Sequence, residues 1–291
     1  MNTIPPRVAA LHDISGVGRC ALTVILPVLS AMGVQACPVP TAVLSTHTGG
    51  FGTPAQKDLT DTLAPALAHY RQLGLTFSCI YSGYLSSPEQ VALCRDFFAA
   101  YPAALAVVDP VMGDHGHAYD SCGPQLQAGM KTLITHAQLI TPNLTEACLL
   151  LDRPYPGDTL SDADAADMLT RLSALGPAQV VLTGVRADSE NTDDNFSDNG
   201  ILVNYGYDRT RQSFYRSTSP RIPVSYPGTG DIFTSVLIGS LLGGVTLPAA
   251  MDAAAHFVQT AVHTTYRLGT DPRLGVALEN CLSCLFPPQA P

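Results

Sequence analysis

The sequence contains no tryptophan and only two lysines, Lys57 and Lys131, among its 291 residues. Charged residues make up 13% of the chain, and 24 acidic residues against 15 basic ones give a formal net charge of −9. Proteins that bind nucleic acid need clustered lysine and arginine to neutralise phosphates, so this balance argues against nucleic acid as a partner. Any phosphate that the protein binds must be held mainly by backbone amides, arginine or a metal ion.

Targeting and membrane-spanning segments are also missing from the sequence. Residues 1–7 contain no basic region followed by a long apolar run, so we expect no signal peptide. No uninterrupted apolar stretch reaches the length that spans a membrane, so we expect no membrane partner. The low charge and the many aliphatic residues indicate a compact cytoplasmic protein with a substantial core.

The eight cysteines are scattered through apolar segments, where we expect reduced and mostly buried thiols. They are Cys20, Cys37, Cys79, Cys94, Cys122, Cys148, Cys281 and Cys284. The last two have the C-x-x-C spacing of redox and zinc sites, but no second pair accompanies them. We therefore predict that they lie on a C-terminal amphipathic helix.

Short apolar segments alternate with amphipathic ones along most of the chain. The pattern predicts strands or strand ends at 8–12, 39–44, 78–84, 105–109, 139–143 and 179–184. It predicts helices at 20–32, 60–73, 88–101, 145–151, 164–175, 231–247 and 248–265. The polar segment 13–18 reads as a turn after the first strand. Nearly continuous apolar strands indicate a mostly parallel central sheet with helices on both faces.

Residues 186–199 break this alternation because they are polar and acidic. The segments 200–205 and 213–215 that follow read as an antiparallel pair. We interpret the exposed connector 186–199 that leads into them as a solvated hairpin. No linker, repeat or low-complexity run divides the chain. We predict that residues 1–291 form a single doubly wound α/β domain with a small antiparallel flap.

Polar residues accumulate just after the predicted strand ends. They are Asp13, Thr46, Tyr84, Asp109, Asn143 and Thr183. In open α/β sheets, ligands bind outside the carboxyl ends of the strands. We therefore expect these side chains to lie along one edge of the sheet.

The most informative segment is Y-P-G-T-G-D at 226–231, which precedes an apolar helical pattern. Gly228 and Gly230 let the backbone approach a ligand, and the first amides of the helix have no internal partner and attract an anion. Asp231 would repel a bound phosphate, but as a base it could take a proton from a hydroxyl that attacks phosphorus. The alternative is that Asp231 is an ordinary helix N-cap.

Two further segments carry carboxylates at strand ends. Asp109 and Asp114 flank a tight turn at Gly113, where they could hold Mg²⁺ directly or through water, or Asp109 could simply cap a turn. Asn143 and Glu146 lie three residues apart at a helix start, so they could grip one hydrated metal or form a capping box.

The segment D-I-S-G-V-G at 13–18 has one G-x-G but lacks the third glycine of a dinucleotide fingerprint, and no acidic residue ends the second strand. This counts against an NAD-dependent enzyme. His47, His115 and His117 have carboxylate neighbours that suit no closed zinc site, so we interpret them as polar loop residues.

Taken together, these motifs resemble the pyridoxal kinase branch of the ribokinase-like superfamily, in the same order from about residue 8 to residue 263. The motifs are H-D-I-S-G-V-G at 12–18, S-T-H-T-G-G at 45–50, Y-S-G-Y at 81–84, D-P-V-M-G-D at 109–114, T-P-N-x-x-E at 141–146 and G-T-G-D at 228–231. The last is shared across the superfamily, whereas those at 45–50 and 81–84 are typical of the vitamin B6 group.

The resemblance implies an ATP- and Mg²⁺-dependent kinase that phosphorylates the 5′-hydroxymethyl group of pyridoxal, pyridoxine or pyridoxamine. It also implies a homodimer and a loop that closes over ATP, and some members of the family respond to potassium. Two alternatives remain open: a hydroxymethylpyrimidine kinase of the same fold, and a vitamer-binding protein without catalysis.

The resemblance also assigns roles to individual residues. It makes Asp231 the general base in contact with the substrate, and the amides of Gly228, Thr229 and Gly230 the anion hole. The residues matching those that hold the pyridine ring are Ser15, Thr48 and Tyr84. The residues matching positions near ATP are Asp109, Asp114, Asn143, Glu146 and Thr183, of which Asp109 and Glu146 also match positions near the metal.

Three positions depart from the family pattern. Gly49 and Gly184 stand where relatives often carry larger or polar residues, which changes the contacts expected at the ring edge and at the nucleotide. Tyr119, in the segment expected to act as the lid, matches the pattern less closely.

Overall fold

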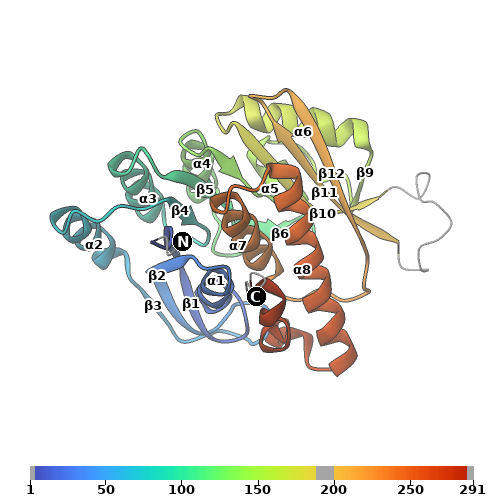
Figure 1. Ribbon diagram of the computed structural model, residues 1–291, viewed down its shortest axis with the longest axis horizontal. Coiled ribbons are helices and arrows are strands. Elements are labelled where there is room, and N and C mark those ends of the chain that lie inside the picture. Colours follow the sequence, from blue (N-terminus) through green and yellow to red (C-terminus); the bar gives the residue numbers. More distant parts are fainter. Residues whose placement is uncertain (1–3, 188–199, 287–291) are drawn as a thin grey trace.

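The computed structural model describes residues 4–187 and 200–286 (Figure 1). Of the connector predicted at 186–199, residues 186 and 187 instead belong to a strand of the main sheet, and the rest lies outside the described residues. One ten-stranded sheet runs through the molecule in the order β12-β11-β10-β8-β5-β4-β1-β2-β3, with β9 beside β10. Its strands are β1 (Arg7–Val17), β2 (Gln35–Thr46), β3 (Gln56–Asp58), β4 (Cys79–Ser82), β5 (Leu105–Val108), β8 (Leu139–Ile140), β9 (Thr159–Leu160), β10 (Gln179–Ala187), β11 (Ile201–Asp208) and β12 (Ser213–Pro220). The central strands pair in parallel, whereas β3, β11 and β12 pair antiparallel at the two edges.

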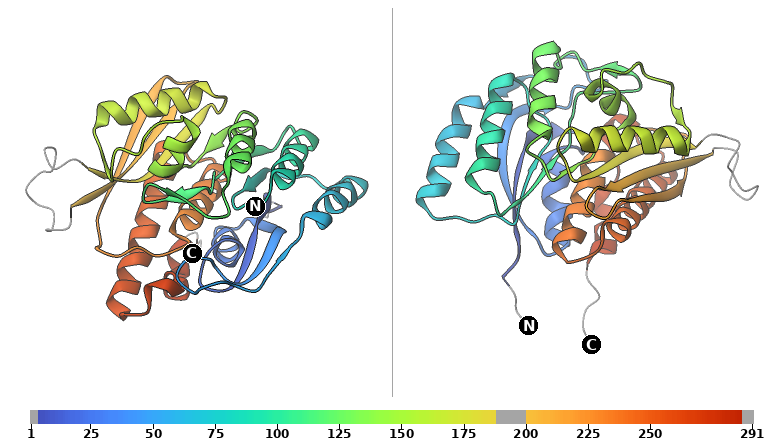
Figure 2. Two further views of the ribbon diagram at one scale, coloured as in Figure 1. Left: turned by 180° about the vertical axis from the view of Figure 1, so that it is seen from behind. Right: turned by 90° about the horizontal axis from the view of Figure 1, so that it is seen from above.

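Helices cover both faces of this sheet, as the views from the front and from above show (Figures 1 and 2). One face carries α1 (Leu22–Ala31), α7 (Thr229–Leu242) and α8 (Leu247–Leu268). The other carries α2 (Thr60–Gln72), α3 (Pro88–Ala100), α4 (Pro124–Ile134), α5 (Leu144–Leu150) and α6 (Asp162–Ala174). The predicted doubly wound α/β fold with a mostly parallel sheet is confirmed.

Burial on both faces explains why the strands read as continuous apolar runs. In β1, Val8 and Ala10 pack with α1, α7 and α8, while Ala9 and Leu11 pack with the helices of the opposite face. Each face therefore needs apolar side chains, and the period-2 alternation of a half-exposed strand is lost. That residues 1–291 form one domain stays a prediction, which the continuity of this sheet supports.

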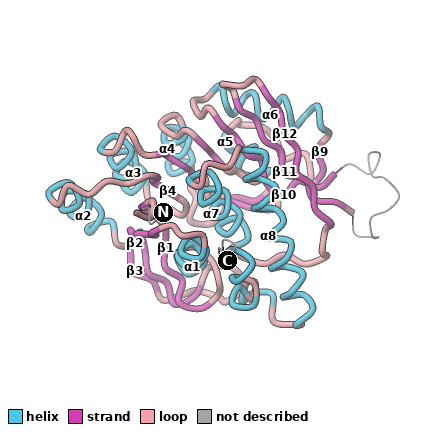
Figure 3. Tube along the Cα trace, viewed as in Figure 1, coloured by secondary structure: helices cyan, strands magenta, loops and turns pink. Residues whose placement is uncertain are grey.

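The antiparallel pair predicted at 200–205 and 213–215 is confirmed, but β11 and β12 extend the edge of the main sheet instead of forming a separate flap (Figure 3). A separate two-stranded antiparallel sheet does exist. It consists of β6 (Gly113–Asp114) and β7 (His117–Ala118), which the sequence did not indicate.

Two local predictions were wrong. Segment 13–18 is not a turn, because β1 continues to Val17 through a bulge between His12 and Ile14 and keeps its pairing with β2. The C-terminal amphipathic helix is replaced by short 3₁₀ turns at Leu278–Asn280 and Leu282–Leu285. Helix α7 lies between the sheet, α1 and α8, and every residue from 232 to 240 is buried.

All eight cysteines are free, and six of them are buried, so the prediction of reduced thiols holds with Cys37 half-buried and Cys284 exposed. Within residues 4–187 and 200–286, no helix combines the length and the apolar character needed to cross a membrane.

The β1–α1 loop and the start of α7 are packed backbone to backbone. Gly228 has a φ of 80°, and a Cβ at this position would lie 2.2 Å from the carbonyl oxygen of Arg19 and 2.8 Å from the Cα of Cys20. A backbone neighbour cannot move aside as a flexible side chain can. The glycine is therefore required both by its conformation and by the close approach.

We expect Gly228→Ala to destabilise the fold by about 1–3 kcal/mol more than Gly244→Ala. Gly244 is a matched control, because its φ of 83° imposes the same conformational strain while its Cβ would meet nothing within 4 Å. The measurement is urea unfolding of both variants and of the native chain. Equal decreases in the free energy of unfolding of the two variants would show that the contact of Gly228 with the β1–α1 loop does not limit the size of this residue.

Candidate active site

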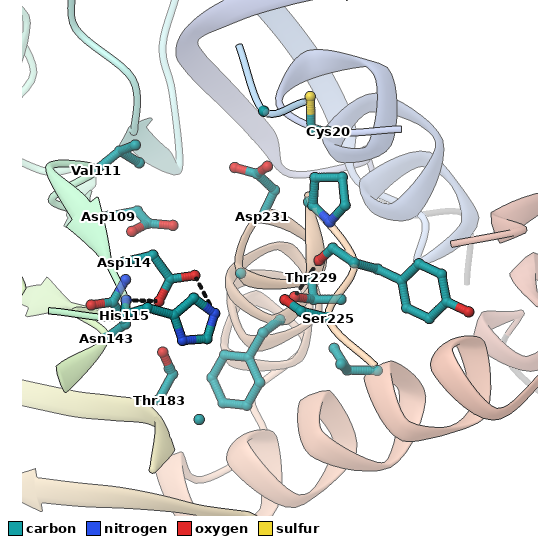
Figure 4. Close-up of a pocket in the computed structure, with 18 of the residues that line it drawn as sticks. Cys20, Asp109, Val111, Asp114, His115, Asn143, Thr183, Ser225, Thr229 and Asp231 are labelled. Carbon is teal, nitrogen blue, oxygen red and sulfur yellow. Dashed lines mark hydrogen bonds and ion pairs between the residues drawn. The ribbon is translucent and has the colours of Figure 1, made fainter. Parts of the chain in front are cut away.

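A cavity of about 830 Å³ opens beyond the carboxyl ends of the central strands. Every residue that the sequence analysis assigned to substrate, ATP, metal or anion hole lines it. In Figure 4, Asp109, Asp114, Asn143 and Thr183 lie on one side of this space, facing Asp231 and Thr229 on the other. The motifs therefore converge as the topology of an open α/β sheet requires, while their individual roles stay predictions.

The start of α7 differs from the capping alternative considered above. Gly228 is the N-cap and adopts a left-handed conformation, and no side chain caps the helix. Asp231 is the third residue of the helix, so the interpretation of Asp231 as the N-cap is wrong. The amides of the first turn face the cavity without a side-chain acceptor from their own helix, which is the arrangement that attracts an anion.

Asp231 is held from outside its own helix. Its Oδ2 accepts a hydrogen bond of 2.8 Å from the backbone N–H of Ala21, which precedes α1, and its Oδ1 lies 3.8 Å from Nδ1 of His12. The side chain is 15% exposed. Burial raises the pKa of Asp231 to about 7; the hydrogen bond from Ala21 opposes this rise, and the charge of Asp13 adds to it. A carboxylate with this pKa can accept a proton near neutral pH.

His12 is the buried neighbour of Asp231, and the contact between them is not an ion pair. Burial lowers the pKa of His12 to about 3, so the imidazole is neutral. The ring packs edge-on against Tyr81 at 4.6 Å, and it fits only because residue 83 is glycine, whose Cβ would lie 1.6 Å from the imidazole. In residues 4–187 and 200–286, neither ring nitrogen of His12 finds a hydrogen-bond partner.

Asp109 lies at the end of β5 and is 6% exposed. Burial and the charge of Asp231 raise its pKa well above the usual range for a carboxyl. Across the described part of the chain, no side chain or amide donates a hydrogen bond to its carboxyl group, so a bound cation would stabilise the ionised form that burial disfavours. Nowhere in that part do three His, Cys, Asp or Glu side chains form a ligand set. The donors fit Mg²⁺, which keeps several waters and takes few protein ligands.

Asn143 and Glu146 form the capping box that was one of the two interpretations of their spacing. Asn143 Oδ1 accepts from Glu146 N at 2.9 Å, and Glu146 Oε2 accepts from Asn143 N at 2.8 Å. Both side chains also hold the start of the β6–β7 hairpin: Glu146 Oε1 accepts from Met112 N at 3.2 Å, and Asn143 Nδ2 donates to the carbonyl of Gly113 at 2.8 Å. Both Glu146 oxygens already accept backbone amides, which does not favour Glu146 as a direct metal ligand.

The predicted vitamer residues gather at one end of the cavity. Ser15 is fully buried and donates to Asp13 at 2.9 Å, while Tyr84 is half-buried and Thr48 is exposed. Burial raises the pKa of Tyr84, so its phenol is neutral. At the other end, Thr183 follows Leu182 in β10 and pairs with Asn143 through an isolated bridge.

Residues 26–274 match the phosphomethylpyrimidine kinase family. The chain belongs to this family. A phosphomethylpyrimidine kinase homologue of Bacteroides thetaiotaomicron, whose crystal structure was determined with pyridoxal, is 41% identical, with a TM-score of 0.89 over 97% of this chain and 96% of the other.

Two further relatives of the kinase carry different substrate names. The pyridoxal kinase of Lactobacillus plantarum is 32% identical, with a TM-score of 0.85 over 96% of each chain. The hydroxymethylpyrimidine/phosphomethylpyrimidine kinase of Rhizobium meliloti is 27% identical over 86% of this chain and 88% of its own length. Membership thus establishes a ribokinase-like kinase fold and leaves the choice between pyridine and pyrimidine to the site.

The kinase cavity has an apolar wall that sequence reasoning missed. It is formed by Leu202, Val224, Phe233, Ala255, Val258 and Val262. Three of these residues follow an i, i+3, i+7 spacing along α8, a pattern that sequence alone assigns to an ordinary core face. Only the position of α8 beside the open edge of the sheet turns this face towards the cavity.

The three departures from the family pattern all lie on the cavity. The amide of Gly49 donates to Nδ1 of His47 at 3.0 Å, and Gly184 adopts a φ of 68° with its amide bound to Oδ1 of Asn204 at 3.0 Å. Gly184 therefore has a backbone reason to be glycine. Tyr119 follows β7 and is 42% exposed.

We expect Glu146→Gln to destabilise the kinase by about 1–3 kcal/mol, because glutamine keeps one acceptor and leaves a buried backbone N–H without its partner. Thermal and urea unfolding measure the loss. Glu89→Gln, an exposed first-turn substitution in α3, is the control and should leave stability unchanged. Unchanged stability of Glu146→Gln together with a weakened Mg²⁺ response would instead favour a direct metal role.

Proposed function

We propose that the protein transfers the γ-phosphoryl group of ATP to the 5′-hydroxymethyl group of pyridoxal, pyridoxine or pyridoxamine. The observation that carries this proposal is Asp231, a carboxylate with a pKa of about 7 on a helix turn whose amides face the same cavity. The pyridoxal-bound relative at 41% identity and the pyridoxal kinase at 32% identity support a B6 vitamer as the acceptor.

In the proposed reaction, Asp231 accepts the proton of the substrate hydroxyl as the hydroxyl oxygen attacks the γ-phosphorus. The bond from the γ-phosphorus to the β,γ-bridging oxygen breaks, and ADP leaves with the electron pair. Because Oδ2 is committed to Ala21, the proton goes to Oδ1. The amides of the first turn of α7 hold the charge that develops on the transferred group.

Asp109 would hold Mg²⁺, with most of the coordination supplied by water and phosphate oxygens. When bound, the ion neutralises part of the phosphate charge. Asn143 and Glu146 act by fixing the loop that leads from Asp109 to Asp114. The apolar wall of the cavity, to which α8 contributes Ala255, Val258 and Val262, offers a surface for the adenine ring.

The second candidate is a hydroxymethylpyrimidine kinase. Two observations favour it: the match to the phosphomethylpyrimidine kinase family and the similarity to the Rhizobium meliloti hydroxymethylpyrimidine/phosphomethylpyrimidine kinase. The third candidate is a vitamer-binding protein without turnover. Assembly as a homodimer, a potassium requirement and a cytoplasmic location stay predictions.

We expect a higher kcat/KM on pyridoxal or pyridoxamine than on hydroxymethylpyrimidine at fixed Mg²⁺-ATP. The physical reason is the neutral Tyr84 phenol, which lines the cavity together with Thr48 and can lie against a planar pyridine ring. Steady-state kinetics on the three compounds decide between the candidates. A preference for the pyrimidine would establish the second candidate, and stabilisation by pyridoxal with only background ATP consumption would establish the third.

We expect Asp231→Asn to lower kcat by at least about two orders of magnitude while ATP and vitamer still bind. The asparagine oxygen can keep the hydrogen bond from Ala21, so folding should be preserved and only the basic Oδ1 is lost. In the native protein, kcat/KM should rise with pH through about 7 as Asp231 loses its proton. Near-native turnover of the variant would rule out Asp231 as the base.

A further inference from the structure

The cavity wall carries more acidic than basic side chains, which is unusual for a site that binds a polyphosphate. Among the described residues that line the cavity there are six carboxylates and no lysine, and the arginines are Arg186, Arg221 and Arg273. Arg273 lies near the Thr48 end, where its guanidinium binds Asp271 and the carbonyl of Gly50. Cationic groups for a nucleotide must therefore come from the opposite end of the wall.

Arg186 lies at that opposite end, on the same strand as Thr183. The two residues are three positions apart in β10, on either side of Gly184, which has a φ of 68° and lies at an irregularity in the pairing with β11. Arg186 Nη1 is 3.1 Å from Oδ2 of Asp158, and its backbone N–H donates to the carbonyl oxygen of Asp158 at 3.0 Å. The backbone hydrogen bond fixes the position of the Arg186 main chain, and the ion pair fixes the position of its guanidinium group.

Asp158 is a shared counter-ion and not a partner of Arg186 alone. Its Oδ1 accepts a hydrogen bond of 2.7 Å from the hydroxyl of Tyr155. This bond, followed by the charges of Arg186, His115 and Arg221, lowers the pKa of Asp158, so the carboxylate stays ionised. All these residues line the cavity, and several cationic or ionisable groups are thus gathered around a single carboxylate at its rim.

The exposure of this ion pair allows an exchange of partners. The side chains of Arg186 and Asp158 are 40% and 39% exposed, and an ion pair between groups this accessible contributes little to stability. A phosphate group offers more charge and more acceptor oxygens than one carboxylate, and the planar guanidinium suits bidentate contact with it. Phosphate can therefore compete successfully with Asp158 for the same donors.

We propose that Arg186 is a ligand of the phosphate chain of the nucleotide, and that Asp158 is the carboxylate which the phosphate displaces from it. The inference rests on the proposed function, since it deepens the ATP site of the kinase. It assigns a binding role to an arginine that none of the sequence motifs contains.

The test measures the Kd of adenosine, AMP, ADP and ATP for the full chain by calorimetry. We expect Arg186→Gln to raise the Kd for ADP and ATP about tenfold while the Kd for adenosine is unchanged, because adenosine carries no phosphate. Arg186→Lys should retain part of the affinity, since it keeps the charge but loses the planar fork. Equal losses for adenosine and ATP, or no loss for ATP, would overturn the proposal.

The chain offers a matched control in Arg153 and Asp167. Their side chains are also 3.1 Å apart and 40% and 44% exposed, but neither residue lines the cavity. Arg153→Gln should leave every nucleotide Kd unchanged. The melting temperatures of the Arg153 and Arg186 variants, measured alongside, separate an effect on folding from an effect on binding.

The role of Asp158 has its own measurement. Asp158→Asn removes the competing charge, so it should tighten ATP binding up to about fivefold in the native background and by a clearly smaller factor in the Arg186→Gln background, where Arg221 still lies near residue 158. Weaker ATP binding in Asp158→Asn alone would overturn the proposed displacement of Asp158 by phosphate.

The native chain separates failure of this inference from failure of the proposed function. If the native chain binds no nucleotide and phosphorylates no vitamer, the proposed function itself fails. If it does both while Arg186→Gln behaves like Arg153→Gln, only this inference fails.

Discussion

The hydrogen bond from Ala21 N–H to Asp231 Oδ2 joins two helix starts that are far apart in the sequence, and the site depends on it. Ala21 adopts a φ of 49° and a ψ of −138°, a conformation that a residue with a Cβ rarely takes. The strain is held in place because Gly228 packs against the backbone of Arg19 and Cys20. The strained conformation lets the Ala21 N–H orient Asp231 from outside its own helix. Oδ2 accepts this hydrogen bond, and Oδ1 remains free to act as the base.

The same packing places like charges close together at low exposure. Burial raises the pKa values of Asp109, Glu146 and Asp231, and Coulombic repulsion between neighbouring carboxyls adds to the rise for Asp109 and Glu146. A carboxyl whose folded pKa is raised contributes stability that is present below its unfolded pKa and is lost as pH rises through the folded value. For Asp231 that loss spans the range from about pH 4 to about pH 7. The resting site therefore favours the arrival of cations, and its charge is suited to a metal-bound nucleotide.

The sequence predicted the strand ends, the motif order and the convergence of the polar residues, because buried parallel strands and ligand loops have strong local patterns. It did not predict the continuation of β1 to Val17, since a bulge and pairing with β2 override the turn-forming residues Asp13 to Gly18. It could not decide between cap and metal ligand for Glu146, because both uses need the same spacing. The apolar wall of α8 and the ion pair of Arg186 were missed because each depends on a neighbour distant in sequence.

The choice of a glycine as the N-cap of α7 explains how a base and an anion site can share one helical turn. A side-chain cap would use its oxygen to accept an amide of the first turn, and that amide would then be lost to a bound phosphate. Gly228 caps the helix without a side chain, so the amides of the first turn stay available. Asp231, the third residue of the helix, is not used to cap it. Asp231 instead accepts a hydrogen bond from the backbone N–H of Ala21, the residue before α1. The helix thus supplies positive potential for the transferred group, while its third residue supplies the negative charge that accepts the proton.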